Sequence, residues 1–454
     1  MPDFTQCTAT ELTDLYRTGS VSPVTVAEQV LAKIERVNPK LNAFCFTDAD
    51  TTLSQAKASE LRWSQAQPLS NFDGIPIAIK DSILIQGWPT LHASRAVDPD
   101  QSWLEDAPAV ARLRQAGAVF AGKTTMSEFG VTANHSNSIL YGNVQNPWNP
   151  AVTTGGSSGG SAVAVAANLV PLALGTDAGA SIAVPCAFCG IFGMKPSAGI
   201  VSQYPSDVLQ MTATGPMART VKDIILAMRI ISGPDIRDST SLLHNHQDYT
   251  CTVPNPIQNL RIARVQTLNN NNIDSEISAT IDVLATWLNS QGASIESIDL
   301  DVNTANDIFY KINEPKIFQQ WLNIPDHRRA LAGRTIQRNA ILAHVKENLY
   351  TQLIQRNQFV ANMRSRTQAY DIILGPATIA SAVNVTSHTQ KISPLSVFCS
   401  MTKQPSVTVP VGLNHSGMPD AVMIVGAMLD DAKLLQVAQA IEQQFAMPAC
   451  PVIL

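Results

Sequence analysis

Residues 155–162 read Gly-Gly-Ser-Ser-Gly-Gly-Ser-Ala and continue directly into a stretch of alanine and valine. Glycine and serine without apolar residues are typical of a flexible linker, but a linker stays polar along its length. Because this segment becomes apolar at once, Gly159 and Gly160 are predicted to open a buried helix. Ser157 and Ser158, which come just before them, are then held in a tight turn against that helix.

Two other segments place reactive side chains in a similar setting. Residues 74–81 read Gly-Ile-Pro-Ile-Ala-Ile-Lys-Asp, so Lys80 ends an apolar run that predicts a strand. Residues 175–185 read Gly-Thr-Asp-Ala-Gly-Ala-Ser-Ile-Ala-Val-Pro and place Ser181 among small residues. A serine hydroxyl is a poor nucleophile until a base takes its proton, and burial makes lysine such a base by lowering its pKa. One lysine and two serines therefore suit a hydrolase that activates serine without histidine.

Helix and strand signals alternate along the chain. Ser22 and Pro23 predict a helix start, because serine caps a first turn and proline fits one. A second helix is predicted over 106–116, with Asp106 as its cap and Gly117 just after its end. Further helices are predicted at Gly160–Asn168 and Ile277–Gln291, and strands at Ala118–Ala121, Val170–Leu174, Leu260–Val265 and Ala293–Leu300. This alternation predicts an α/β fold around a largely buried sheet.

The composition narrows the class of protein. The chain has 454 residues, of which 45% are hydrophobic and 15% charged, an ordinary globular balance. Its net charge of −5 argues against a surface for nucleic acid or for an anionic membrane. No stretch reaches the about 18 apolar residues of a membrane span, residues 1–20 lack the features of a signal peptide, and seven scattered cysteines do not form a disulfide framework. We expect a cytoplasmic protein.

In their order along the chain, these segments resemble the amidase signature family. The family pattern has a lysine on a strand, a GGSSGGS loop and a GTDxGGSIRxP segment, which correspond here to Lys80, Ser157 and Ser181. Segments 117–129, 142–149 and 404–410 match further parts of the pattern. The resemblance is dense over residues 74–230, returns over residues 370–445 and is weak between them.

The resemblance implies a fold and a domain layout. The expected fold is a large mixed β-sheet covered on both faces by helices, in a single amidase domain spanning residues 1–454. Residues 74–230 would form the signature core with the catalytic residues. Residues from about 300 to 390 would form a divergent, mainly helical region on the substrate side.

The resemblance also implies roles for single residues. Ser181 corresponds to the nucleophile, Ser157 to the serine that relays a proton, with a cis peptide bond before it, and Lys80 to the base. The main-chain amides of Ala178, Gly179 and Ala180 correspond to the oxyanion hole. The implied reaction is hydrolysis of an amide carbon–nitrogen bond through an acyl-enzyme, which releases ammonia or an amine and needs no metal and no cofactor.

The pocket and the partners are less well specified. Met126, Ser158 and Thr132 are the expected substrate contacts. The segments expected to line the pocket are Trp88–Ala93, Met126–Asn134 and the weakly matching region 305–390. Small aliphatic amides, aryl amides and carboxylated ureas all stay open as substrates. An amidotransferase-type subunit of a larger complex is the alternative function. A homodimer and a small accessory subunit both stay open, and no nucleic-acid or membrane partner is expected.

Two residues depart from the family pattern. Alanine stands at position 180, where the family usually has glycine, and at position 183, where it usually has arginine. The Ala180 methyl disfavours a positive φ, and Ala183 removes a cation from the nucleophile loop. A catalytically weakened relative is therefore a further alternative.

Two other motifs suggest different chemistry. Gly117 to Thr124 satisfies the pattern of a phosphate-binding loop, but the predicted helix precedes it and the predicted strand occupies it. Cys186 and Cys189 form a CxxC pair without a second pair or a suitably spaced histidine. We expect a buried strand at the first motif and buried packing at the second.

Overall fold

A computed structural model describes residues 2–132, 134–243, 247–268, 273–343, 349–380, 384–385 and 393–451. Its centre is an eleven-stranded mixed sheet. The strands are β1 (Phe44–Phe46), β2 (Pro76–Lys80), β3 (Val119–Thr124), β6 (Leu172–Asp177), β7 (Phe192–Lys195), β8 (Ala213–Ala218), β9 (Arg261–Thr267), β10 (Ser294–Asp299), β11 (Ile372–Pro376), β12 (Ser406–Leu413) and β13 (Pro419–Gly426). Their order is β1-β3-β2-β6-β8-β7-β12-β13-β11-β9-β10, and a separate pair is formed by β4 (Asn137–Ser138) and β5 (Gly142–Asn143).

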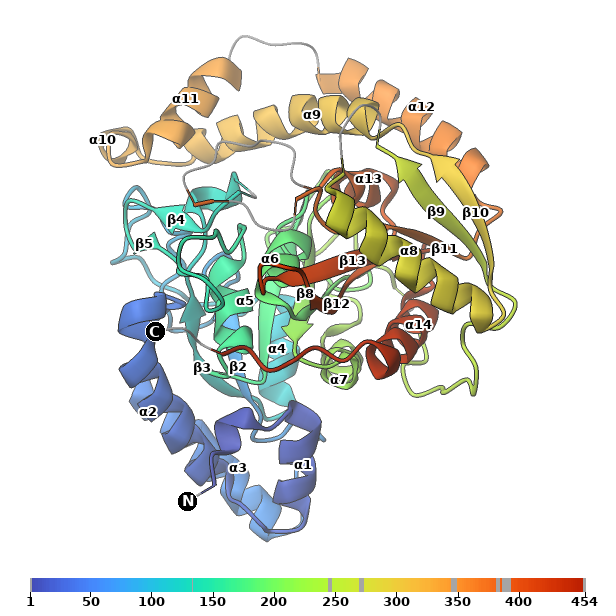
Figure 1. The fold of residues 1–454 in the computed structure, drawn as a ribbon. Helices are drawn as coiled ribbons and strands as arrows, with labels where there is room; N and C mark the ends of the chain where they lie inside the picture. Colours follow the sequence, from blue (N-terminus) through green and yellow to red (C-terminus); the bar gives the residue numbers. More distant parts are fainter. Residues whose placement is uncertain are drawn as a thin grey trace.

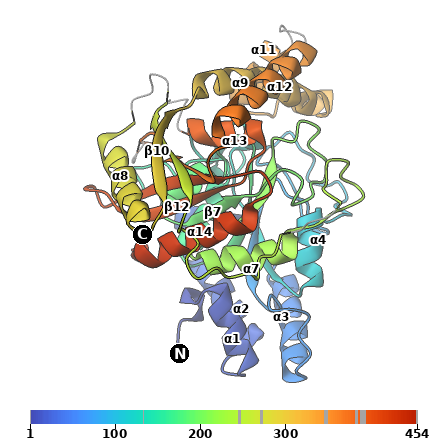
Figure 2. The same cartoon turned by 90° about the vertical axis from the view of Figure 1, so that its right-hand side faces the viewer.

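Helices flank this sheet (Figure 1). They are α1 (Ala9–Arg17), α2 (Pro23–Leu41), α3 (Ala49–Ser64), α4 (Pro108–Gln115), α5 (Gly159–Ala166), α6 (Ala183–Cys189), α7 (Val221–Ile231), α8 (Ser275–Ser290), α9 (Val302–Leu322), α10 (Asp326–Arg329), α11 (Arg334–Ala343), α12 (Leu349–Thr367), α13 (Pro394–Thr402) and α14 (Asp431–Gln444), with 3-10 turns η1 (Phe4–Gln6) and η2 (Glu128–Gly130). In both views α1–α3 lie at one end of the molecule and α9–α12 at the other (Figures 1 and 2). Within the described ranges, no helix combines the length and the apolar character that a membrane crossing requires.

The predicted α/β alternation is confirmed, with small shifts of the boundaries. The Ser22 hydroxyl accepts the Thr25 N–H at 3.1 Å and so caps α2, as expected. Helix α4 begins later than predicted, and Ala107, not Asp106, is its cap. The prediction of an Asp106 cap was wrong because this carboxylate binds other donors, the Gln86 N–H at 2.7 Å and the Arg114 guanidinium at 2.7 Å.

Glycines on three neighbouring strands leave room for the loop before α6. A methyl group added to Gly175 on β6 or to Gly215 on β8 would lie 3.1 Å from the Ile182 side chain. One added to Gly193 on β7 would lie 2.7 Å from the same side chain. Ile182 follows Ser181 directly, so this glycine floor sets how closely the loop with Ser181 approaches the sheet.

Gly215→Ala tests the glycine floor. The added methyl would overlap the Met194 carbonyl oxygen, and backbone cannot rotate away as a side chain does. We expect the free energy of unfolding to fall by about 1–3 kcal/mol or more, the range for overpacked sites. Gly426→Ala on β13 is the control, since its methyl would meet a neighbour only at 3.3 Å. Chemical denaturation of both variants checks the prediction, and equal losses would contradict it.

Candidate active site

Lys80 lies at the end of β2 with a fully buried side chain. Its amine is 2.7 Å from the Ser157 hydroxyl oxygen and 2.8 Å from the Thr176 hydroxyl oxygen. Strand β2 lies between β3 and β6 in the sheet, and Thr176 belongs to β6. The neighbouring strand therefore holds the lysine against the turn that carries Ser157.

Burial changes the acid–base behaviour of Lys80. Loss of hydration lowers the pKa of the amine to about 7, although the nearby Asp177 carboxylate acts in the opposite direction. A charged ammonium is costly to keep out of water, so the neutral amine gains population near neutral pH. The side chain can then accept a proton from the Ser157 hydroxyl, which an ordinary surface lysine cannot do.

Ser157 sits in a densely packed turn. The peptide bond between Gly156 and Ser157 is cis, as the resemblance implied. The Ser136 hydroxyl donates to the Ser157 carbonyl oxygen at 3.3 Å. A methyl group added to Gly130 would lie 3.3 Å from the Ser157 hydroxyl oxygen. The lack of a side chain at Gly130 therefore keeps the hydroxyl approachable from that side.

The Asp177 carboxylate holds the loop that carries Ser181. It accepts the N–H of Ala180 at 2.8 Å, of Ile182 at 2.7 Å and of Ala183 at 3.2 Å. The last two amides belong to the first turn of α6, where N–H groups lack partners within the helix. Asp177 thus ties the end of β6 to the start of α6 and fixes the path of the chain past Ser181.

Ser181 is half-buried and is linked to Ser157 through the main chain. Its carbonyl oxygen accepts the Ser158 N–H at 3.2 Å, so the two serine-bearing turns lie side by side. Within the described part of the chain, no hydrogen bond ends on the Ser181 hydroxyl. The structure therefore brings Lys80 and Ser157 into direct contact but does not show a hydrogen bond from Ser157 to Ser181.

The two departures from the family pattern have visible consequences. Ala180 has a φ of 149°, a conformation that favours glycine. Its N–H is directed at Asp177, which argues against the predicted use of this amide as an oxyanion donor; Ala178 and Gly179 stay predictions. Ala183 is buried in an apolar cluster that also contains Phe309, so the position where the family usually has arginine is apolar here.

The three expected substrate contacts lie at different depths. Ser158 is fully buried, and its hydroxyl is 3.3 Å from the Thr176 carbonyl oxygen, which argues against contact with a substrate. Met126 is also buried. Thr132 is half-buried, and its carbonyl oxygen accepts the Ser127 hydroxyl at 3.1 Å. Of the three residues, only Thr132 is partly exposed.

Two contributions to the site were missed at the sequence level. Thr176 lies inside the Ser181 segment, two residues after the predicted strand Val170–Leu174, and the structure extends that strand to Asp177. Phe309 of α9 packs on the oxyanion loop, since a methyl group added to Gly179 would lie 2.7 Å from its ring. No local pattern identifies Phe309, because it lies 130 residues after Gly179, in the part of the sequence that matches the family weakly.

The two motifs that suggested different chemistry are structural. Gly117 to Thr124 contains strand β3, as predicted, and Lys123 is buried 3.8 Å from Asp81. Cys186 and Cys189 are buried in α6, where burial raises the pKa of both thiols. In the described ranges no group of three His, Cys, Asp or Glu residues could hold a metal ion.

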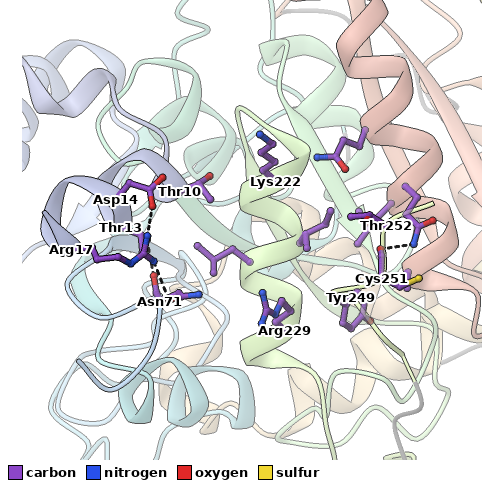
Figure 3. A pocket seen from close by; sticks show the side chains of 16 residues that line it. Thr10, Thr13, Asp14, Arg17, Asn71, Lys222, Arg229, Tyr249, Cys251 and Thr252 are labelled. Atoms are coloured by element: carbon purple, nitrogen blue, oxygen red, sulfur yellow. Dashed lines mark hydrogen bonds and ion pairs between the residues drawn. The ribbon is translucent and has the colours of Figure 1, made fainter. Parts of the chain in front are cut away.

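A cavity of about 250 Å³ lies away from these residues, between α1, α7 and α14 (Figure 3). Its lining includes Thr10, Asp14, Lys222, Arg229 and Gln436. Lys80, Ser157 and Ser181 do not line it, so it is not the cleft in which these side chains would act.

Comparisons with known proteins bear on the family and the fold. The protein family described as Amidase matches residues 25–435. The chain is 30% identical to a glutamyl-tRNA(Gln) amidotransferase subunit from Chromobacterium violaceum, over 97% of this chain and 98% of that protein. Among solved structures, a bacterial aryl acylamidase of the amidase signature enzymes has a TM-score of 0.87 at 24% identity, with 96% of each chain covered. The native peptide amidase of Stenotrophomonas maltophilia has a TM-score of 0.86 at 25% identity, with 99% of each chain covered.

Ala180→Gly tests the strain in the nucleophile loop. A positive φ raises the free energy of the folded state by about 1–3 kcal/mol for a residue with a side chain. Replacing alanine with glycine lowers stability by about 0.4–1 kcal/mol, because glycine gives the unfolded chain more conformational entropy. We expect the free energy of unfolding to rise by about 1 kcal/mol. Ala178→Gly in the same loop is the control, because φ of Ala178 is not positive and the exchange should destabilise. Denaturant titration measures the free energy of unfolding of both variants. Equal losses in the two variants would show that the backbone at Ala180 is not strained.

Proposed function

The chain belongs to the amidase family, and on this premise we propose that it cleaves an amide carbon–nitrogen bond through an acyl-enzyme on Ser181. The observation that carries the proposal is the buried contact of 2.7 Å between the Lys80 amine and the Ser157 hydroxyl oxygen. Burial supplies the lowered pKa that a lysine needs to act as a base at neutral pH.

The first half of the reaction forms the bond between Ser181 and the acyl carbon and breaks the carbon–nitrogen bond. Lys80 takes the Ser157 proton while Ser157 takes the Ser181 proton, and the Ser181 oxygen attacks the substrate carbonyl carbon. The amides of Ala178 and Gly179 are the proposed donors to the oxyanion. Return of the proton through Ser157 to the leaving nitrogen breaks the carbon–nitrogen bond and releases ammonia or an amine.

The second half repeats these steps with water. Water attacks the acyl carbon and gives a proton to Ser157, while Ser157 gives its own proton to Lys80. Return of the proton through Ser157 to the Ser181 oxygen breaks the ester bond and releases the acid, which restores Ser181. Catalytic hydrogen bonds are often long before substrate binds. The Ser181 hydroxyl is therefore expected to turn toward Ser157 when an amide is bound. Lys80 and Ser157 transfer the protons in both halves, and Ser181 forms and breaks the bond to the acyl group.

A second candidate function is that of an amidotransferase component. The observation in its favour is the similarity to the glutamyl-tRNA(Gln) amidotransferase subunit from Chromobacterium violaceum over 97% of the chain. In that role the same site would release ammonia for a tRNA-linked reaction inside a complex with other proteins. Ammonia release from glutamine that requires a co-expressed partner would favour this role, whereas hydrolysis of simple amides by the isolated chain favours the amidase.

We also propose where the protein is located, what it binds and how the chain is divided into domains. We place the protein in the cytoplasm, supported by the tRNA-linked name of its relative and by seven free cysteines. The proposed ligand is a small amide. A single amidase domain over the whole chain is proposed as well, supported by the family match from residue 25 to 435.

Ser181 is predicted to be the residue that becomes acylated. A fluorophosphonate probe should label the wild-type protein on Ser181, and peptide mapping by mass spectrometry locates the adduct. Ser181→Ala should lose labelling and amide hydrolysis. Ser290→Ala, which removes a hydroxyl from the last turn of α8, should lose neither. An adduct on Ser157 or Ser158 would overturn the assignment.

Lys80→Met should remove catalysis without unfolding the protein, because methionine keeps an apolar stem of similar length. We expect kcat/KM to fall about 100- to 10,000-fold, the range for a lost general base. In the wild type, kcat/KM should rise with pH up to about 7 and then level, since the amine is a base only above its pKa. Steady-state assays across pH check both results.

Lys57→Met on α3 provides the control for the lysine exchange, because Lys57 is exposed. It should leave both the rate and the pH profile unchanged. Hydrolysis at the wild-type rate by Lys80→Met would eliminate the mechanism.

A further inference from the structure

Three residues near the candidate site share a rare backbone conformation. His92, Ala93 and Phe129 have φ values of 50°, 54° and 50°, in the left-handed region, and none of them is glycine. This conformation costs free energy for residues with a side chain, and it gathers at catalytic and ligand-binding sites. Contacts elsewhere in the fold must therefore hold these three residues in a backbone conformation that they do not favour by themselves.

The Asp81 carboxylate holds the His92 segment in this conformation. It accepts the Leu91 N–H at 3.2 Å and the Ala93 N–H at 2.7 Å, one on each side of His92. Asp81 follows Lys80 directly, so the segment is anchored at the end of the strand that carries the lysine. The His92 carbonyl oxygen accepts the Phe129 N–H at 2.9 Å, which joins the segment to η2.

The His92 ring lies flat against the Phe129 ring, with centroids 5.9 Å apart and planes at 13°. The residue after Phe129 is Gly130, which approaches the Ser157 hydroxyl as described above. The His92 ring is thus packed on a residue whose chain neighbour lies against the Ser157 hydroxyl.

The ring is neutral and has hydrogen-bonding capacity left. Burial, together with the positive charges of Lys123 and Lys80, lowers the pKa of His92 to about 4. A neutral imidazole has one N–H donor and one nitrogen acceptor. The residue is half-buried, and across the described ranges no hydrogen bond ends on either ring nitrogen. The packing thus fixes the ring without using its polar atoms.

We propose that His92 is a substrate-binding residue whose imidazole forms a hydrogen bond with the substrate amide beside Lys80 and Ser157. One donor and one acceptor match the N–H and C=O of an uncharged amide. The inference rests on the proposed amide hydrolysis and adds to it a binding group for neutral amides.

The test compares His92→Phe with the wild-type protein. Phenylalanine keeps a flat ring to stack on Phe129 but has no nitrogen. The substrate is whichever of butyramide, benzamide and succinamide the wild type hydrolyses fastest. We expect KM to rise about 3- to 10-fold, the ratio for one lost hydrogen bond between neutral groups, while kcat changes less than KM. Fluorophosphonate labelling of Ser181 should persist.

Two further variants separate binding from packing. His92→Gln restores a donor and an acceptor and should keep KM nearer to wild type than His92→Phe does. His415→Phe makes the same exchange at an exposed histidine, whose side chain is 90% accessible, and should leave KM unchanged.

An unchanged KM in folded His92→Phe, with or without a lower melting temperature, would show that His92 only packs and would overturn the proposal. So would a KM for His92→Gln as high as that for His92→Phe. A wild type that neither labels nor hydrolyses any of the three amides would instead refute the proposed function itself.

Discussion

The contact between the buried Lys80 amine and the Ser157 hydroxyl is the constraint on which the rest of the site depends. Keeping a charged lysine ammonium group away from water costs free energy. The fold lowers this cost by placing the amine against the hydroxyls of Ser157 and Thr176 and within the field of Asp177. Burial outweighs these contacts and makes a neutral amine available near pH 7, so the proposed chemistry follows from the burial of the lysine.

The second constraint is the position of Ser181 relative to that pair. Asp177 binds three amides of the nucleophile loop, and the glycine floor under Ile182 lets the loop lie close to the sheet. These contacts explain how the loop stays ordered with alanine at position 183, where the family usually has arginine. The carboxylate is satisfied by main-chain donors, and Ala183 is buried in an apolar cluster that includes Phe309.

The sequence predicted the parts of the site that depend on local pattern. Lys80 at a buried strand end, the helix that begins at Gly159 and the packing role of Cys186 and Cys189 were all readable, because burial follows apolar runs. The predicted cap at Asp106 failed because a carboxylate near a helix start has other donors within reach. Contacts between distant segments, such as Phe309 on Gly179, leave no trace in a single sequence.

The pKa of Lys80 in the folded protein decides whether burial makes this lysine a neutral base. Protein labelled with ¹³C at the lysine side chains can be titrated by NMR, with Lys80→Met used to assign the Lys80 Cε signal. If burial lowers the pKa of Lys80, the midpoint should lie at about pH 7. A midpoint near 10.5, the ordinary pKa of a lysine amine, would mean that Lys80 stays charged at neutral pH and would contradict the account.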